Sequence, residues 1–149
     1  MKLSKRLKSI ADLILESTDV IDVGADHGLL SIYLNKYKNC SCLATDISHK
    51  SLERARINSI KYDSSISLMV TDGLRGISLK DQVIVIAGMG TKTIKKILDI
   101  KLDNDLIIMS HTNINELKEF LASKSYNIVL EKEVFDKRYY TIIKASKLF

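Results

Sequence analysis

The apolar residues of this chain recur in two patterns, one typical of amphipathic helices and one typical of buried strands. Spacings of three or four residues, with charged residues between them, predict helices. The first such helix spans residues 3–17. Four later groups of apolar residues predict further helices: Leu29, Leu30, Tyr33, Leu34 and Tyr37; Leu52, Ala55 and Ile60; Ile94, Ile97 and Leu98; Ile114, Leu117, Phe120 and Leu121. The helix of the second group begins after a predicted cap at Ser48.

Short apolar runs between these helices predict strands. They span residues 20–23, 40–45, 66–70, 83–87 and 106–109, followed by 126–135 and 138–146. The middle runs are apolar almost throughout, which is typical of parallel strands covered on both faces. The last two are joined without room for a helix, so they must be antiparallel. We therefore predict an α/β fold, a Rossmann-like, doubly wound and mostly parallel seven-stranded sheet with a C-terminal antiparallel hairpin.

Length and composition suit one domain. The chain has 149 residues, of which 46% are apolar and 28% charged, and we predict a single domain over residues 1–149, with a basic amphipathic helix (1–18) before the core (19–149). The longest aliphatic run, residues 83–87, is far short of the ~20 residues that a membrane span requires. The N-terminus has no continuous apolar core of a secretory signal. We expect a cytoplasmic protein.

The net charge of +5 is concentrated at the N-terminus. Lys2, Lys5, Arg6 and Lys8 fall in the first eight residues with no acid among them. Such a basic edge suits a polyanionic partner, although a solvated helix face would have the same composition.

The cysteines and histidines do not predict a metal site. Cys40 and Cys42 lie two apart in a predicted strand, a spacing that suits neither a disulfide nor a metal knuckle, so we expect inert thiols. His49 and His111 join no cysteine or acid in a recognisable metal-binding spacing.

Glycine is scarce and its positions are informative. The chain has six glycines and no proline, where average usage would give roughly 10 and about 7. The glycines fall in three pairs, and each pair follows a predicted strand: Gly24 and Gly28, Gly73 and Gly76, Gly88 and Gly90. Ligands of open parallel sheets bind outside the carboxyl ends of the strands. The three glycine loops therefore predict one ligand site.

The first of these loops, residues 22–28, reads D-V-G-A-D-H-G. Asp26 stands where a dinucleotide site has its second glycine, and its carboxylate would repel a pyrophosphate. The same carboxylate suits a ligand with a cationic amino group and a sulfonium, such as S-adenosylmethionine. A parallel sheet that ends in an antiparallel hairpin is also more typical of S-adenosylmethionine-dependent methyltransferases than of nicotinamide oxidoreductases.

Two further acids follow the second and third strands. Asp46 lies 22 positions after Gly24, close to the ~20-residue offset at which an acid accepts hydrogen bonds from ribose hydroxyls. The alternative is a surface acid or a helix cap. Asp72 could accept the adenine amino group while Gly73 leaves room for the ring, although Asp-Gly is also a common turn.

The loop after the fourth strand, residues 87–90, limits which kind of atom could accept a methyl group. Enzymes that methylate exocyclic amines or cytosine C5 use proline-containing motifs, and this chain has no proline. The loop also has no side chain that could act as a base. An acceptor with a free in-plane lone pair, such as adenine N1, needs only positioning and stabilisation of the developing charge.

Four segments together resemble the bacterial tRNA (adenine-22-N1)-methyltransferase family: L-S-K-R-L (3–7), D-V-G-A-D-H (22–27), D-G-L (72–74) and A-G-M-G (87–90). The resemblance runs nearly end to end. It implies S-adenosylmethionine as cofactor, tRNA as partner, and Lys5 and Arg6 as phosphate contacts. It also implies a cofactor site formed by Asp22, Gly24, Asp26, His27, Gly28, Asp46, Ile47, Asp72, Gly73, Ala87, Gly88, Met89 and Gly90.

The chain departs from the family pattern in three places. The family usually has another glycine directly after A-G-M-G, where this chain has Thr91. The Cβ of Thr91 would crowd the loop, or its hydroxyl would cap the next helix. Residues 110–113 read S-H-T-N and keep only the asparagine of the usual Q-P-N. Family members carry a C-terminal helical extension, which we do not expect here because the sequence stops at Phe149, just after the last predicted strand. These departures leave a non-catalytic RNA-binding remnant of the fold as the alternative function.

Two residues are candidates for acting near the transferred methyl group. Asp26 could stabilise the cationic product or orient the cofactor, and the alternative is a hydrogen bond that orders the loop. Asn113 could bind the target adenine, although asparagine is a routine helix cap. His27 could contact substrate or pack at a helix start.

Overall fold

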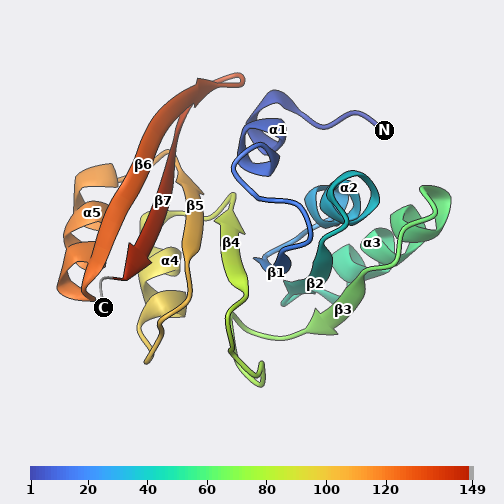
Figure 1. Cartoon of the computed structure of the whole chain (residues 1–149), viewed down its shortest axis with the longest axis horizontal. Helices are drawn as coiled ribbons and strands as arrows, with labels where there is room; N and C mark the ends of the chain where they lie inside the picture. The colour runs from blue at the N-terminus through green and yellow to red at the C-terminus, as the bar shows by residue number, and fades with distance from the viewer. Residues whose placement is uncertain (148–149) are drawn as a thin grey trace.

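The computed structural model describes residues 1–147, whose strands all belong to one sheet (Figure 1). The strands are β1 (Asp19–Val23), β2 (Ser41–Asp46), β3 (Ser67–Val70), β4 (Val83–Ala87), β5 (Leu106–Ser110), β6 (Tyr126–Phe135) and β7 (Tyr139–Lys147). Their order in the sheet is β3-β2-β1-β4-β5-β7-β6. Neighbours are parallel except at β7, which is antiparallel to both β5 and β6. The predicted Rossmann-like sheet with a C-terminal antiparallel hairpin is confirmed.

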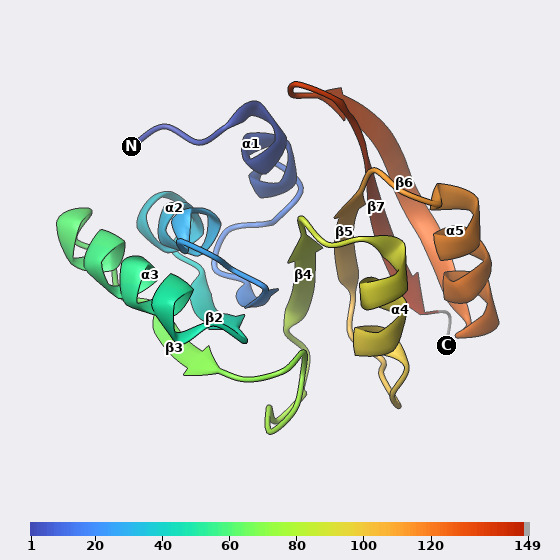
Figure 2. The same cartoon turned by 180° about the vertical axis from the view of Figure 1, so that it is seen from behind.

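Within residues 1–147, five helices cover the two faces of this sheet (Figures 1 and 2). They are α1 (Lys5–Ala11), α2 (Leu29–Lys38), α3 (His49–Lys61), α4 (Thr91–Leu98) and α5 (Ile114–Ser123). Side chains alternate between the faces along each strand, so that Ile84 and Ile86 join the core under α4 and α5 while Val85 joins the core under α1 and α2. The order of the strands and this double covering confirm the doubly wound arrangement.

The N-terminal helix is shorter than predicted. We expected it to span residues 3–17, but α1 ends at Ala11. After the C-cap residue Asp12, the N–H groups of Leu13 and Ile14 donate to carbonyls only three residues back, at Ile10 and Ala11, which tightens the last turn. Ser17 then takes a left-handed conformation with φ of 60° and donates to the Lys38 carbonyl. The apolar pattern continued past the helix because Ile14 is buried in this turn.

Two residues of the predicted helix faces are exposed. Ile60 of α3 is 68% exposed, while the buried position on that turn is Ser59, whose hydroxyl donates to the Ser64 carbonyl. Tyr37 at the end of α2 is 48% exposed and packs against Tyr33. Both lie in the last turn of their helices, where the chain leaves the sheet surface.

No helix within residues 1–147 combines the length and the apolar composition needed to cross a membrane.

Candidate functional site

A cavity of about 660 Å³ opens at the carboxyl ends of β1, β2 and β4. The predicted loop residues that line it come from three separate segments: Asp22, Gly24, Asp26 and His27; Asp46; Ala87, Gly88 and Met89. Parallel pairing of β2, β1 and β4 puts these segments at one edge because all three strands end there. The structure thus brings together most of the cofactor residues that the sequence predicts.

Gly24 makes the turn out of β1 possible. Its φ is +71°, a left-handed conformation that disfavours any residue with a side chain. The tip of the Met89 side chain lies where a Cβ on residue 24 would stand. The next residue, Ala25, donates its N–H to the Thr45 carbonyl at 2.8 Å, which fixes the loop to the end of β2. The backbone of this loop forms part of the cavity wall.

Asp22 is the buried acid of the cavity wall. It is only 3% exposed and accepts a hydrogen bond of 2.8 Å from the Ser31 hydroxyl. The pKa of Asp22 is raised from 3.8 to about 6, mainly by burial. The Ser31 hydroxyl lowers this pKa, and the nearby Asp46 carboxylate contributes to raising it. A cation placed in the cavity would relieve both unfavourable effects.

Asp46 joins the loops after β1 and β2. One carboxylate oxygen accepts the Asp26 N–H and the other accepts the Ser48 N–H, each at 3.0 Å. Asp46 is not the helix cap that the sequence left open, because the hydroxyl of Ser48 caps α3 by accepting the Ser51 N–H. Asp46 instead orders the turn that leads into α3. A carboxylate has about four acceptor positions, so these two bonds leave room for hydroxyl donors from a ligand.

Asp26 and His27 stand at the mouth of the cavity. Asp26 has a left-handed φ of 53° and an exposed side chain. Its carboxylate lies 3.5 Å from Nε2 of His27. Asn58 of α3 donates to the His27 carbonyl at 3.0 Å, which holds this turn against α3. The side chain of Asp26 is thus available to a ligand, while its backbone is fixed by Asp46.

Several predicted residues lie outside the border of this cavity. Gly28 begins α2, and a Cβ there would stand 2.8 Å from the Cβ of Ala55, so its role in the structure is the close approach of α2 to α3. Ile47 is 70% exposed beside the cavity. Gly90 is the N-cap of α4, and Asn113 occupies the N-cap position of α5 without capping it through its side chain.

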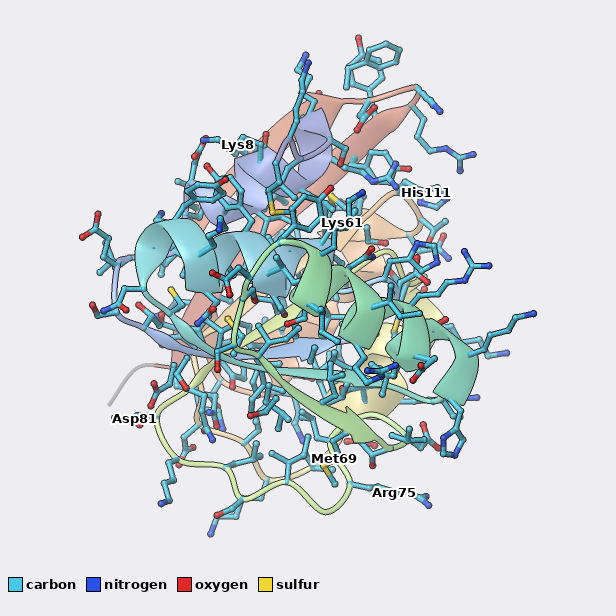
Figure 3. The ribbon with its side chains drawn as sticks, turned by 90° about the vertical axis from the view of Figure 1, so that its right-hand side faces the viewer. Lys8, Lys61, Met69, Arg75, Asp81 and His111 are labelled. Atoms are coloured by element: carbon cyan, nitrogen blue, oxygen red, sulfur yellow. The ribbon has the colours of Figure 1, made fainter. Side chains whose placement is uncertain are left out.

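Asp72 and Gly73 line a second cavity, of about 410 Å³, together with Arg75 and with Lys96 and Ile97 of α4. Figure 3 shows Arg75 near the bottom of the view, well below His111. The predicted contact of Asp72 with an adenine amino group would therefore require a ligand that reaches from the first cavity toward this second one. That role stays a prediction.

The structure shows what Thr91 does in place of the family's glycine. Its hydroxyl donates to the Thr112 carbonyl at 2.6 Å, and its N–H donates to the Thr112 hydroxyl at 3.2 Å. The side chain is 1% exposed. Thr91 neither crowds the loop nor caps its own helix. It ties the start of α4 to the loop after β5.

Residues of the α1 segment also line the cavity, although none of them is among the predicted cofactor residues. Ser4, Arg6 and Leu7 line the cavity, as do Leu29, Leu30, Ser51 and Met109. The L-S-K-R-L segment predicts a helix and, by the family resemblance, phosphate contacts, and its apolar Leu7 is the available signal that it packs against the site. Lys5 is exposed and lies outside the cavity border.

The cysteines and histidines within residues 1–147 form no further site. Cys40 and Cys42 are buried free thiols, and burial raises the pKa of Cys42 well above its usual range. In this part of the chain no group of three His, Cys, Asp or Glu side chains lies together in a way that could hold a metal ion.

Known proteins match most of this chain. A family model described as a methyltransferase domain matches residues 3–143. A Mycoplasma genitalium protein provisionally named a tRNA methyltransferase is 32% identical, over 98% of this chain and 71% of that protein. The tRNA (adenine(22)-N(1))-methyltransferase of Bacillus subtilis is 29% identical, over 88% of this chain and 59% of that enzyme.

The solved structure of M. capricolum TrmK in complex with S-adenosyl-homocysteine superposes with a TM-score of 0.89. It is 32% identical in sequence, and the match covers 99% of this chain and 70% of that one. S-adenosyl-homocysteine is described there as the natural cofactor product.

Proposed function

This chain belongs to the methyltransferase family that includes the tRNA (adenine-N1)-methyltransferases, and we propose that it methylates N1 of the adenine at position 22 of tRNA. The methyl donor is S-adenosylmethionine, whose product occupies the M. capricolum relative. These relatives favour catalysis over a non-catalytic RNA-binding remnant. A tRNA substrate also suits an enzyme of the cytoplasm, and we propose that residues 1–149 act as one domain.

The single observation that carries the proposal is the chemistry of the first cavity. Its wall combines the carboxylates of Asp22, Asp26 and Asp46 with the glycine-containing loops after β1 and β4. Such a wall fits S-adenosylmethionine, because its amino group and sulfonium are cationic and its ribose offers hydroxyl donors. A ligand with a pyrophosphate would instead meet three acids. The three carboxylates therefore fit S-adenosylmethionine better than a dinucleotide.

The residues of the cavity have distinct proposed roles. We assign the cationic end of the cofactor to Asp22 and Asp26 and the ribose to Asp46, and Ile47 beside the cavity offers an exposed apolar surface for the base. When bound, the cofactor supplies an electrophilic methyl group on its sulfonium. Asp26 is also the proposed catalytic residue, since its exposed carboxylate can stabilise positive charge that develops on the acceptor ring.

The loop after β4 suits an acceptor that has no proton to lose. Ala87, Gly88 and Met89 carry no titratable side chain, and they line the same cavity as the acids. Adenine N1 has an in-plane lone pair, so methyl transfer to it needs alignment rather than a base. Asn113, whose amide does not cap α5, is the proposed hydrogen-bond partner of the target adenine.

The test of this function is a transfer assay on two tRNA transcripts. The purified chain is incubated with labelled S-adenosylmethionine and with transcripts that differ only in having adenine or guanine at position 22. We expect label only in the first transcript, recovered as N1-methyladenosine after digestion and mass spectrometry. Equal labelling of both transcripts, or methylation of another atom, would contradict the assignment.

A further inference from the structure

A continuous group of side chains leads from the first cavity to the tip of the β6–β7 hairpin. Arg6 lines the cavity, and its guanidinium lies 5.2 Å from the centre of the Tyr140 ring and donates to the Tyr140 hydroxyl at 3.2 Å. The His111 ring packs edge-on against Tyr140 at 5.5 Å between centroids. Arg138 at the hairpin tip in turn lies 2.8 Å from Nε2 of His111.

The hairpin tip is also fixed to α1 through the backbone. The Arg6 N–H donates to the Asp136 carboxylate at 3.3 Å. Figures 1 and 2 both show the tip rising beside α1, beyond the other strands, and Figure 3 shows His111 below this raised tip. These contacts make the tip an extension of the cavity rim rather than a separate protrusion.

Two aromatic rings stand exposed on this tip. Phe135 and Tyr139 pack against each other with centroids 4.9 Å apart, and they are 51% and 66% exposed. Exposed Lys137 and Arg138 lie between them in sequence. The acid of the turn, Asp136, is engaged by the Arg6 N–H. Exposed aromatic rings flanked by cations match the chemistry of an unpaired nucleotide, whose base stacks and whose phosphate is anionic.

We infer that Phe135 and Tyr139 form a stacking platform for an unpaired nucleotide of the tRNA that neighbours the target adenine. The inference rests on the proposed function, which supplies the RNA. The cations of the turn favour RNA over a second copy of this chain, since both copies would bring the same positive charges to the contact. Arg6 links the platform to the cavity, because it lines the cavity and contacts Asp136 and Tyr140, which adjoin Phe135 and Tyr139 in sequence.

The test compares three variants with the wild-type chain. The double variant Phe135→Ala with Tyr139→Ala removes both rings. Phe135→Tyr with Tyr139→Phe keeps two rings at the same positions. Tyr37→Ala is the matched control, since it removes an exposed tyrosine from the end of α2. The measurements are the Kd for fluorescent tRNA, the Kd for S-adenosylmethionine, the KM for tRNA and the thermal midpoint.

The alanine pair should raise the Kd and KM for tRNA roughly tenfold, while the affinity for S-adenosylmethionine and the thermal midpoint stay at wild-type values. The tyrosine–phenylalanine swap and Tyr37→Ala should both bind tRNA as wild type does. With a fully paired RNA duplex the alanine pair should bind as tightly as wild type, because a duplex offers no free base to stack.

Unchanged tRNA affinity in the alanine pair would overturn the platform while leaving the methyltransferase assignment intact. A loss that is equal for tRNA and duplex, or a change of oligomeric state in the variant, would also overturn it. If the wild-type chain binds tRNA without methylating it, the proposed function fails, and the binding comparison still decides the platform.

Discussion

At the scale of the residue, the sequence predicts where the acids lie better than what each one contacts. The spacing of Asp22, Asp26 and Asp46 in the chain correctly indicated one edge of the sheet, and all three line the same cavity. The spacing did not indicate that Asp46 would also bind the backbone N–H groups of Asp26 and Ser48. Replacement of Asp46 would therefore disturb the loop as well as a ribose contact.

Burial of Asp22 has a consequence for stability that depends on pH. Its pKa of about 6 in the folded chain exceeds the value of 3.8 for the free group. The folded state therefore keeps a proton that the unfolded state releases between these pH values, and stability falls as pH rises through this window. Above pH 6 the full penalty applies, about 3 kcal/mol from two pKa units at 1.36 kcal/mol each.

Asp22→Asn should remove this penalty, because a neutral amide can still accept the Ser31 hydrogen bond. We expect the variant to match wild type near pH 4 and to gain stability up to pH 6 and above, measured by denaturant unfolding across that range. Ser31→Ala should move the window of the wild-type carboxyl to higher pH, since the charged form loses a donor. Parallel stability curves for wild type and Asp22→Asn would refute this account.

At the scale of the element, the helices are fixed by contacts that their own sequences do not reveal. The apolar pattern of residues 3–17 fitted a longer helix than α1, because Ile14 is buried in a turn rather than on a helix. The start of α4 is held by hydrogen bonds from Thr91 to the loop after β5, across 21 residues of chain. The spacing of apolar residues within a helix cannot indicate a hydrogen-bond partner that lies so far away in the chain.

The start of α2 gives a prediction at this scale. A Cβ on Gly28 would combine a left-handed φ of +75° with a 2.8 Å approach to the Ala55 Cβ. Gly28→Ala should therefore lower the free energy of unfolding by about 2–4 kcal/mol. Denaturant titration of the purified variant measures this, and adding Ala55→Gly should recover part of the loss by relieving the clash.

Gly76→Ala is the matched control for backbone strain. Its φ of +74° is nearly the same, but its nearest neighbour is the end of the Met69 side chain at 3.3 Å, which can move. The control should lose less stability than Gly28→Ala. Equal losses would mean that strain alone, and not the packing of α2 on α3, explains the glycine.

At the scale of the whole molecule, the charge distribution matters for tRNA binding. The net charge is +5, and Lys5 and Arg6 lie on α1 at the rim of the cavity or beside it. Binding to a polyanion releases counterions, so the logarithm of the affinity for tRNA should fall linearly with the logarithm of salt concentration. Association should also be fastest at low salt.

Single substitutions test where the phosphates lie. Lys5→Gln and Arg6→Gln should each reduce the slope of log affinity against log salt by roughly one, as expected for one lost phosphate contact. Lys101→Gln is the control, because Lys101 precedes β5 and therefore lies toward the amino ends of the parallel strands, away from the cavity. A control that reduces the slope as much as Lys5→Gln would argue against α1 as the tRNA-binding edge.

The sequence by itself determined the α/β class, the parallel strands and the three glycine loops. It could do so because strand periodicity, turn chemistry and the common edge of parallel strands depend on residues close together in the chain. Only the tertiary structure decided that α1 forms a wall of the cavity, that Asp72 lines a second cavity, and that the hairpin tip joins the rim. Arg6 and Tyr140 are 134 residues apart, and packing alone brings such partners together.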